Sequence, residues 1–146
     1  MQDLNRNKQS VRALYEDVLS GQRLALADEL FALPAGAADF RASVADLISA
    51  FPDIHYTVLD LVAEGDRVAV RFQWTGTFNA PFRGFAPTQV VVTATGMAIF
   101  RFADGRIAGV ELQTDRLGFL QQLGVVPPLA ALRVPAPALD PATAPQ

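Results

Sequence analysis

The feature that most constrains the fold is a change in the spacing of apolar residues near Pro52. Before Pro52, apolar side chains recur every three or four positions, as in amphipathic helices. After it, apolar and polar side chains alternate, as in strands that bury one face. A block of helices followed by a block of strands predicts an α+β domain.

Three helices are expected before Pro52, at positions 7–20, 24–33 and 39–50. Asn7 or Ser10 is suited to cap the first helix, because short polar side chains accept hydrogen bonds from first-turn N–H groups. Pro34 should end the second helix, since proline interrupts the hydrogen-bond ladder. Asp39 is the expected N-cap of the third.

Four strands follow, at positions 54–63, 67–78, 89–103 and 106–114. Gly65 and the pair Asp104-Gly105 mark tight turns, so consecutive strands should form antiparallel hairpins. Gly96, in the middle of the third strand, indicates a bulge or a bend. We therefore expect a curved antiparallel sheet with the N-terminal helices packed on its concave face, forming a cone with an internal pocket.

Composition narrows the classes of function. The net charge is −3 and no basic run occurs, so no nucleic-acid partner is expected. The chain has no cysteine and one histidine, His55, which argues against a metal site and against a Ser-His-Asp triad. No apolar run approaches the ~20 residues of a membrane span, and the polar N-terminus lacks a signal-peptide core. The expected location is the cytoplasm, with no membrane partner.

The chain divides into two parts by composition. Residues 1–127 carry the helix and strand patterns and form the expected domain. Residues 128–146 are rich in proline and alanine, which prevents a regular helix or an inner strand. We expect a C-terminal tail that is either flexible or laid along its own domain or a neighbour.

Asp115 is the residue best placed for acid–base chemistry. It stands at the end of the last strand and before a short apolar helical turn at 117–123. On that strand, alternation alone turns the even positions toward the core and Glu111, Gln113 and Asp115 toward water. Asp115 is therefore either an acid–base group beneath an apolar cap or the N-cap of the turn that follows it.

Several motifs in order along the chain resemble those of one family, the SnoaL-like polyketide cyclases. These proteins are also called ester cyclases and belong to the nuclear transport factor 2-like superfamily. The resemblance rests on F-P-D at 51–53, A-E-G-D-R-V at 63–68, G-F-A-P-T at 84–88, R-F-A-D-G-R-I at 101–107, Asp115, and Q-L-G at 122–124. Together they extend over nearly all of residues 5–127.

The resemblance carries expectations of its own. It implies a curved sheet with helices over its concave face, an apolar pocket, a hydrophobic small-molecule substrate, no metal, no organic cofactor, and commonly a homodimer. It implies that Asp115 is the acid–base residue in the intramolecular aldol closure of a polyketide ring. It also implies that the odd face of the last strand, with Glu111 and Gln113, turns inward.

The candidate substrate-binding residues under this resemblance are Gln113, Glu111, Trp74, Phe78, Tyr15 and Met97. For each of Trp74, Phe78 and Tyr15 the alternative is a place in the hydrophobic core. The sequence departs from the family pattern at three places. Many members have histidine where Phe78 stands, tryptophan where Glu111 stands, and another histidine in the segment after the second helix, which here is short and has none at 31–40.

These departures keep other functions open. The expected activity is a cofactor-independent cyclase that acts on a polyketide-like intermediate in natural-product biosynthesis. One alternative is shape-driven cyclisation, pericyclic or by epoxide opening, in which the pocket walls fold the substrate and no specific acid is needed. The other is a non-catalytic protein that binds a hydrophobic small molecule.

Overall fold

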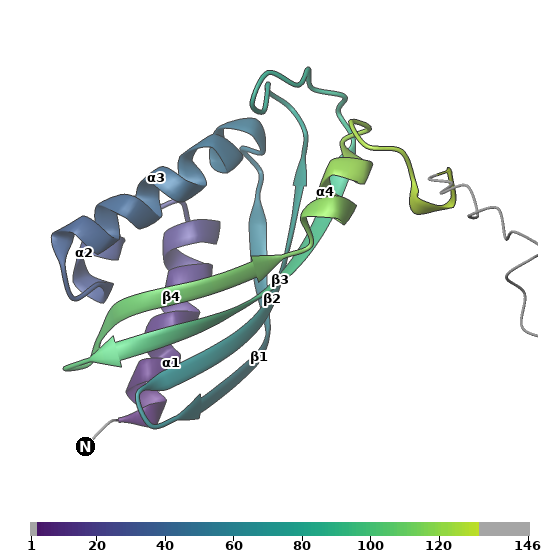
Figure 1. Ribbon diagram of the computed structural model, residues 1–146. Helices are drawn as coiled ribbons and strands as arrows, with labels where there is room; N and C mark the ends of the chain where they lie inside the picture. The colour runs from purple at the N-terminus through teal and green to yellow at the C-terminus, as the bar shows by residue number, and fades with distance from the viewer. Residues whose placement is uncertain (1–2, 132–146) are drawn as a thin grey trace, which may run out of the picture.

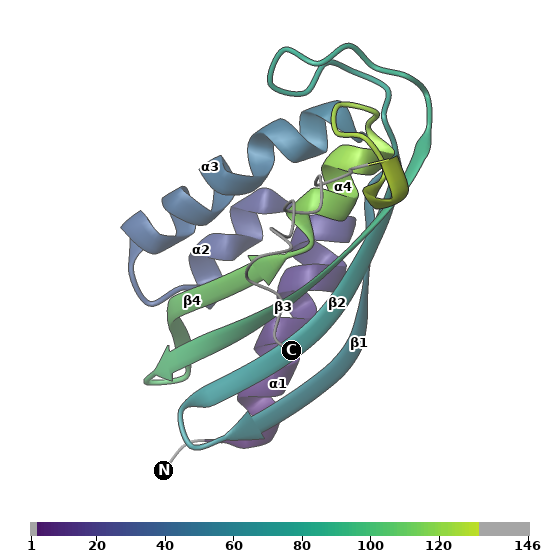
Figure 2. The same cartoon turned by 45° about the vertical axis from the view of Figure 1, so that its right-hand side comes forward.

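The computed structural model describes residues 3–131 and has helices over one face of a curved, open sheet (Figures 1 and 2). The sheet has four antiparallel strands in the order in which they follow along the chain. They are β1 (His55–Glu64), β2 (Arg67–Thr77), β3 (Val91–Ala103) and β4 (Arg106–Thr114). The α+β class and the curved antiparallel sheet with helices on its concave face are confirmed.

The first helix begins earlier than the sequence indicated. α1 (Leu4–Ala13) continues without a break into a π-helical segment, η1 (Leu14–Ser20). Asp3 is the N-cap, and its carboxylate accepts a hydrogen bond from the first turn. The expected caps Asn7 and Ser10 both lie inside α1, because the carboxylate of Asp3 already satisfies a first-turn N–H one turn upstream.

Pro34 starts a helix and does not end one. The second helical segment is a 3₁₀ turn, η2 (Leu24–Leu26), joined to the short helix α2 (Ala27–Leu30). Pro34 is then the first residue of α3 (Pro34–Ala50). Proline is well suited to this position, since its missing N–H has no partner there in any residue. Asp39, the expected cap, lies within α3.

Gly96 allows the Phe72 side chain to pack closely against β3. The β2–β3 register is regular through Gly96, so the expected bulge at this residue is wrong. A Cβ at position 96 would lie 2.6 Å from the Phe72 ring, and glycine therefore makes room for that aromatic side chain. The register irregularities lie elsewhere, between Val58 and Asp60 and between Arg101 and Phe102.

The F-P-D motif, at residues 51–53, holds the start of β1 to the end of β2. Phe51 is fully buried, and its ring stacks on Phe78 at 5.5 Å and contacts Trp74 at 5.0 Å between centroids. The carboxylate of Asp53 accepts hydrogen bonds from the backbone N–H and the hydroxyl of Thr77, each at 2.7 Å. These bonds lower the pKa of Asp53 and join the start of β1 to the end of β2.

The helix α4 (Arg116–Gln122) follows β4 and lies against the sheet near the start of β3 (Figure 2). The side-chain amide of Gln122 fixes it there, accepting from the Thr93 N–H at 2.8 Å and donating to the Thr93 carbonyl at 2.7 Å. Gly124, at a φ of 82°, ends the helical segment as expected. Most of the expected tail, residues 132–146, lies outside the described residues. Within residues 3–131 no helix is both long and apolar enough to cross a membrane.

Candidate functional site

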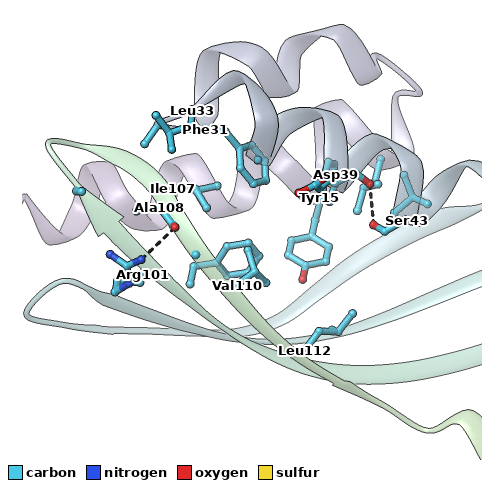
Figure 3. A pocket seen from close by; sticks show the side chains of 18 of the residues that line it. Tyr15, Phe31, Leu33, Asp39, Ser43, Arg101, Ile107, Ala108, Val110 and Leu112 are labelled. Atoms are coloured by element: carbon cyan, nitrogen blue, oxygen red, sulfur yellow. Dashed lines mark hydrogen bonds between the residues drawn. The ribbon is translucent and has the colours of Figure 1, made fainter.

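A cavity of about 730 Å³ lies between the concave face of the sheet, η1, α3 and the segment before α3 (Figure 3). This volume is in the range of small-molecule sites. The walls are mostly apolar, and they include Phe31, Phe40, Val44, Phe72, Phe100 and Ile107. We call this space the large cavity.

The polar side chains of the large cavity come from both of its walls. Asp39 and Ser43 come from α3, Arg101 from β3, and Tyr15 and Tyr56 from η1 and β1. Burial, with a smaller effect of the neighbouring Tyr56, raises the pKa of Tyr15, and burial alone raises the pKa of Tyr56. Both phenols therefore stay protonated at neutral pH and present O–H donors.

A second cavity of about 390 Å³, here called the small cavity, lies beside α4. Its lining includes the aromatic residues Trp74, Phe82, Phe85 and Phe119 and the charged residues Asp46, Arg83, Asp115 and Arg116. Ser43 of α3 lines both cavities, so the two spaces adjoin. On β4, Leu112 lines the large cavity and Thr114 the small one. The two cavities thus lie side by side between α3 and β4.

Asp115 is both a helix cap and a wall of the small cavity. Its Oδ1 accepts a hydrogen bond from the Gly118 N–H at 2.8 Å, and its own N–H donates to the Thr95 carbonyl at 3.1 Å. Gly118 makes room for the carboxylate, because a Cβ at position 118 would lie 2.2 Å from Oδ2 of Asp115. The side chain is exposed and is not sealed within an apolar pocket.

Three expected pocket residues lie on the other face of the sheet. Gln113 pairs with Met97 and Glu111 pairs with Ile99 across the β3–β4 ladder. Met97 is 60% exposed and Ile99 50%, while the even positions of β3 are buried. The inward turn of the odd face is therefore wrong, and Glu111, Gln113 and Met97 line neither cavity. From Val110 onward the expected alternation, with Leu112 inward, holds, whereas Ile107 also faces inward because of the register irregularity between Arg101 and Phe102.

The aromatic candidates divide between cavity and core. Tyr15 lines the large cavity and Trp74 the small one. Phe78 lines neither, because it is fully buried against Phe51. Tyr56 was missed by the sequence reasoning, although its pairing with Trp74 puts it on the same inward face. The inward parity of β1 was the signal that would have found it.

Acidic residues do not gather into a metal-binding group. In the part of the chain from residue 3 to residue 131, no three histidine, cysteine, aspartate or glutamate side chains lie close enough together to hold an ion. The chemistry available in the two cavities is thus that of three carboxylates, three arginines and two phenols set among aromatic walls.

Comparison with known proteins identifies the family. The model of the SnoaL-like polyketide cyclase family matches residues 9–123, which is most of the chain. The chain belongs to this family. A candidate polyketide cyclase from Acidithiobacillus ferrooxidans is 27% identical over 85% of this chain and 98% of its own, with a TM-score of 0.73. IdmH, a candidate polyketide cyclase from Streptomyces antibioticus, is 28% identical over 82% and 99%, with a TM-score of 0.71.

A third structural neighbour supports the fold alone. TsrD from Streptomyces laurentii is 24% identical over 86% of this chain and 100% of its own, with a TM-score of 0.77. No curated protein matches the chain. Membership of the SnoaL-like family points to a cyclase or isomerase type of function.

Proposed function

We propose that this protein is a cofactor-independent cyclase acting on a hydrophobic, polyketide-like intermediate of natural-product biosynthesis, with Asp115 as acid and base. The proposal includes a cytoplasmic location and a homodimer. The observation that carries it is the position of Asp115 in an aromatic cavity that adjoins a larger apolar one through Ser43. The apolar body of a substrate fits the large cavity while its reacting end reaches the carboxylate.

The reaction requires a single carboxyl group. A methylene between two carbonyls is acidic, and Asp115 takes its proton as the C–H bond breaks. The resulting enolate carbon attacks a second carbonyl of the same molecule, and the new C–C bond closes the ring. The alkoxide oxygen then recovers the proton from Asp115. Nothing is gained or lost by the substrate, so the net reaction is an isomerisation.

Charge near Asp115 supports this chemistry. Arg83 and Arg116 line the same small cavity, and the Arg83 guanidinium lies 5.5 Å from the Phe82 ring centroid. Positive charge beside an aromatic, partly dry surface stabilises an enolate or alkoxide as it forms. Asp115 keeps Oδ2 without a hydrogen bond from residues 3–131, since the cap bond uses Oδ1.

Replacing Asp115 by Asn and by Ser tests the proposal. Both residues cap helices about as well as Asp, so α4 should persist while the titratable carboxyl is lost. With an anthraquinone polyketide that carries a β-keto ester side chain, we expect a ~10²–10⁴-fold lower rate of ring closure, followed by chromatography. The melting temperature should stay within a few degrees.

Native rates in both variants would show that the carboxylate is not the catalyst. The exposure of Asp115 favours one alternative in that case, shape-driven cyclisation inside the large cavity. Val44→Trp, which fills that cavity, would then abolish turnover. A protein that binds the polyketide but never changes it, in wild type and variants alike, would be the non-catalytic binding protein.

A further inference from the structure

We propose that Tyr15 and Tyr56 form a two-donor subsite in the large cavity that binds a carbonyl or phenol oxygen of an aromatic or polyenic ligand. We call these residues the tyrosine pair. The inference rests on the proposed function only in taking the large cavity as the ligand site. It adds what that ligand must carry: an oxygen acceptor on the part of the molecule remote from Asp115.

The tyrosine pair joins two elements at one wall of the cavity. Tyr15 comes from η1 and Tyr56 from β1, and their ring centroids are 5.7 Å apart. The side chains are 4% and 6% exposed, yet both line the cavity. Figure 3 shows the Tyr15 hydroxyl directed into this space, toward Leu112 of β4.

Neither hydroxyl is bonded within the described part of the chain. Among residues 3–131, no hydrogen bond to the hydroxyl of Tyr15 or of Tyr56 is present. Both hydroxyls open onto the cavity and are not among the buried polar atoms, so they can bond to what enters it. As protonated phenols, both can donate a hydrogen bond to an oxygen acceptor on the ligand.

Hydrogen bonds to the Tyr56 backbone fix the positions of the two tyrosines relative to each other. Ser20, the last residue of η1, accepts a hydrogen bond from the Tyr56 N–H at 2.8 Å and donates to the Tyr56 carbonyl at 3.2 Å. Both backbone groups of Tyr56 are thus tied to the π-helical segment that carries Tyr15. π-helical turns are rare and occur often at functional sites. Ser20 is therefore a positioning residue for the pair.

The walls beside the pair define the rest of the ligand. The Tyr15 ring lies 4.8 Å from Phe72 and 6.2 Å from Phe100, and both phenylalanines line the cavity. Such surfaces favour flat, unsaturated groups. A polyketide, whose oxygens recur along a carbon chain, offers an acceptor here and reactive carbonyls toward the small cavity.

Two isosteric probes test the subsite without any turnover. 2-Acetylnaphthalene has a carbonyl where 2-isopropenylnaphthalene has a methylene of nearly the same shape, and equilibrium dialysis gives both dissociation constants. We expect the wild-type protein to prefer the ketone by about 10-fold, the effect of two neutral hydrogen bonds. Tyr15→Phe and Tyr56→Phe should each remove part of this preference, and the double variant all of it, while the hydrocarbon binds unchanged.

Ser20→Ala tests the positioning role. It should reduce the preference with both tyrosines present, and Ser43→Ala, on the opposite wall, should not. Equal binding of the two probes by the wild type, or equal weakening of both by the phenylalanine variants, overturns the inference. Asp115→Asn should leave the preference intact, so failure of the acid–base proposal and failure of this one give different results.

Discussion

Tyr15 and Tyr56 are the only tyrosines of the chain, which makes their ionisation directly visible. The pKa of each is raised by burial, so the folded protein favours the protonated phenols. A raised pKa in the folded state contributes stability that is fully present below the unfolded value of about 10 and is lost as the pH rises above it.

An alkaline titration should therefore show no phenolate at the ordinary pKa. We expect absorbance at 295 nm to remain low at about pH 10 and to rise only together with unfolding at higher pH. The free energy of unfolding should fall steadily over the same interval. A phenolate step near pH 10 with the circular dichroism unchanged would mean that one of the tyrosines is exposed.

Single positions on β4 show what the sequence could and could not predict. Alternation placed Val110 and Leu112 on the inner face, and the structure agrees. The family resemblance predicted that Glu111 and Gln113 face inward. This would exchange the two faces of β4, whose orientation is fixed by its pairing with buried residues of β3 such as Phe100. Asp115 lines the small cavity without this exchange, because the strand has ended before it.

At the scale of elements, packing at Gly96 decides how β2 and β3 fit beneath the helices. Gly96→Ala would press a methyl group against Phe72, 2.6 Å away, and against the Gln113 carbonyl and Thr114, each 3.0 Å away. We expect a loss of about 1–3 kcal/mol, as for other overpacked cores, measured by urea unfolding.

Two further variants test whether contact with the Phe72 ring causes that loss of stability. Phe72→Leu alone should also destabilise the protein, but in the Gly96→Ala background it should cost less, because the clash is relieved. Thr95→Ala, on the neighbouring outward position, should have little effect. Additive losses from Gly96→Ala and Phe72→Leu would show that the ring is not what the glycine accommodates.

The sequence predicted element boundaries correctly where a residue type favours a single local structure. Gly65 and the pair Asp104-Gly105 correctly predicted the β1–β2 and β3–β4 hairpins, because few residue types suit the backbone of a tight turn. Pro34 has two uses, since proline both interrupts a helix and begins one, and only the packing of α3 selects between them. The same choice moved Asp39 from a cap to the wall of the large cavity.

At the scale of the whole molecule, the last side-chain hydrogen bond within residues 3–131 reaches Pro127. The Gln121 side-chain amide donates to the Pro127 carbonyl at 3.0 Å, whereas Leu129, just beyond, is 70% exposed. The division at residue 127 stays a prediction drawn from the proline-rich composition that follows.

Truncation after Pro128 should therefore leave the melting temperature unchanged within a few degrees. Sedimentation should show the proposed homodimer before and after truncation. Loss of the dimer together with a large fall in melting temperature would make the C-terminal segment an assembly element. A monomer in both forms would remove the homodimer proposal and leave the cavities as they are.

Gly118 reserves the space in which the Asp115 carboxylate lies. Alanine is more favourable than glycine in a helix by roughly 1 kcal/mol. At position 118, however, any Cβ would enter the space that the carboxylate now fills and would break its cap bond, which is itself worth about 1 kcal/mol. The gain in helix propensity and the loss of the cap nearly cancel, so stability alone does not select glycine here. A descendant with alanine at position 118 would be about as stable, but its acid would be in the wrong place.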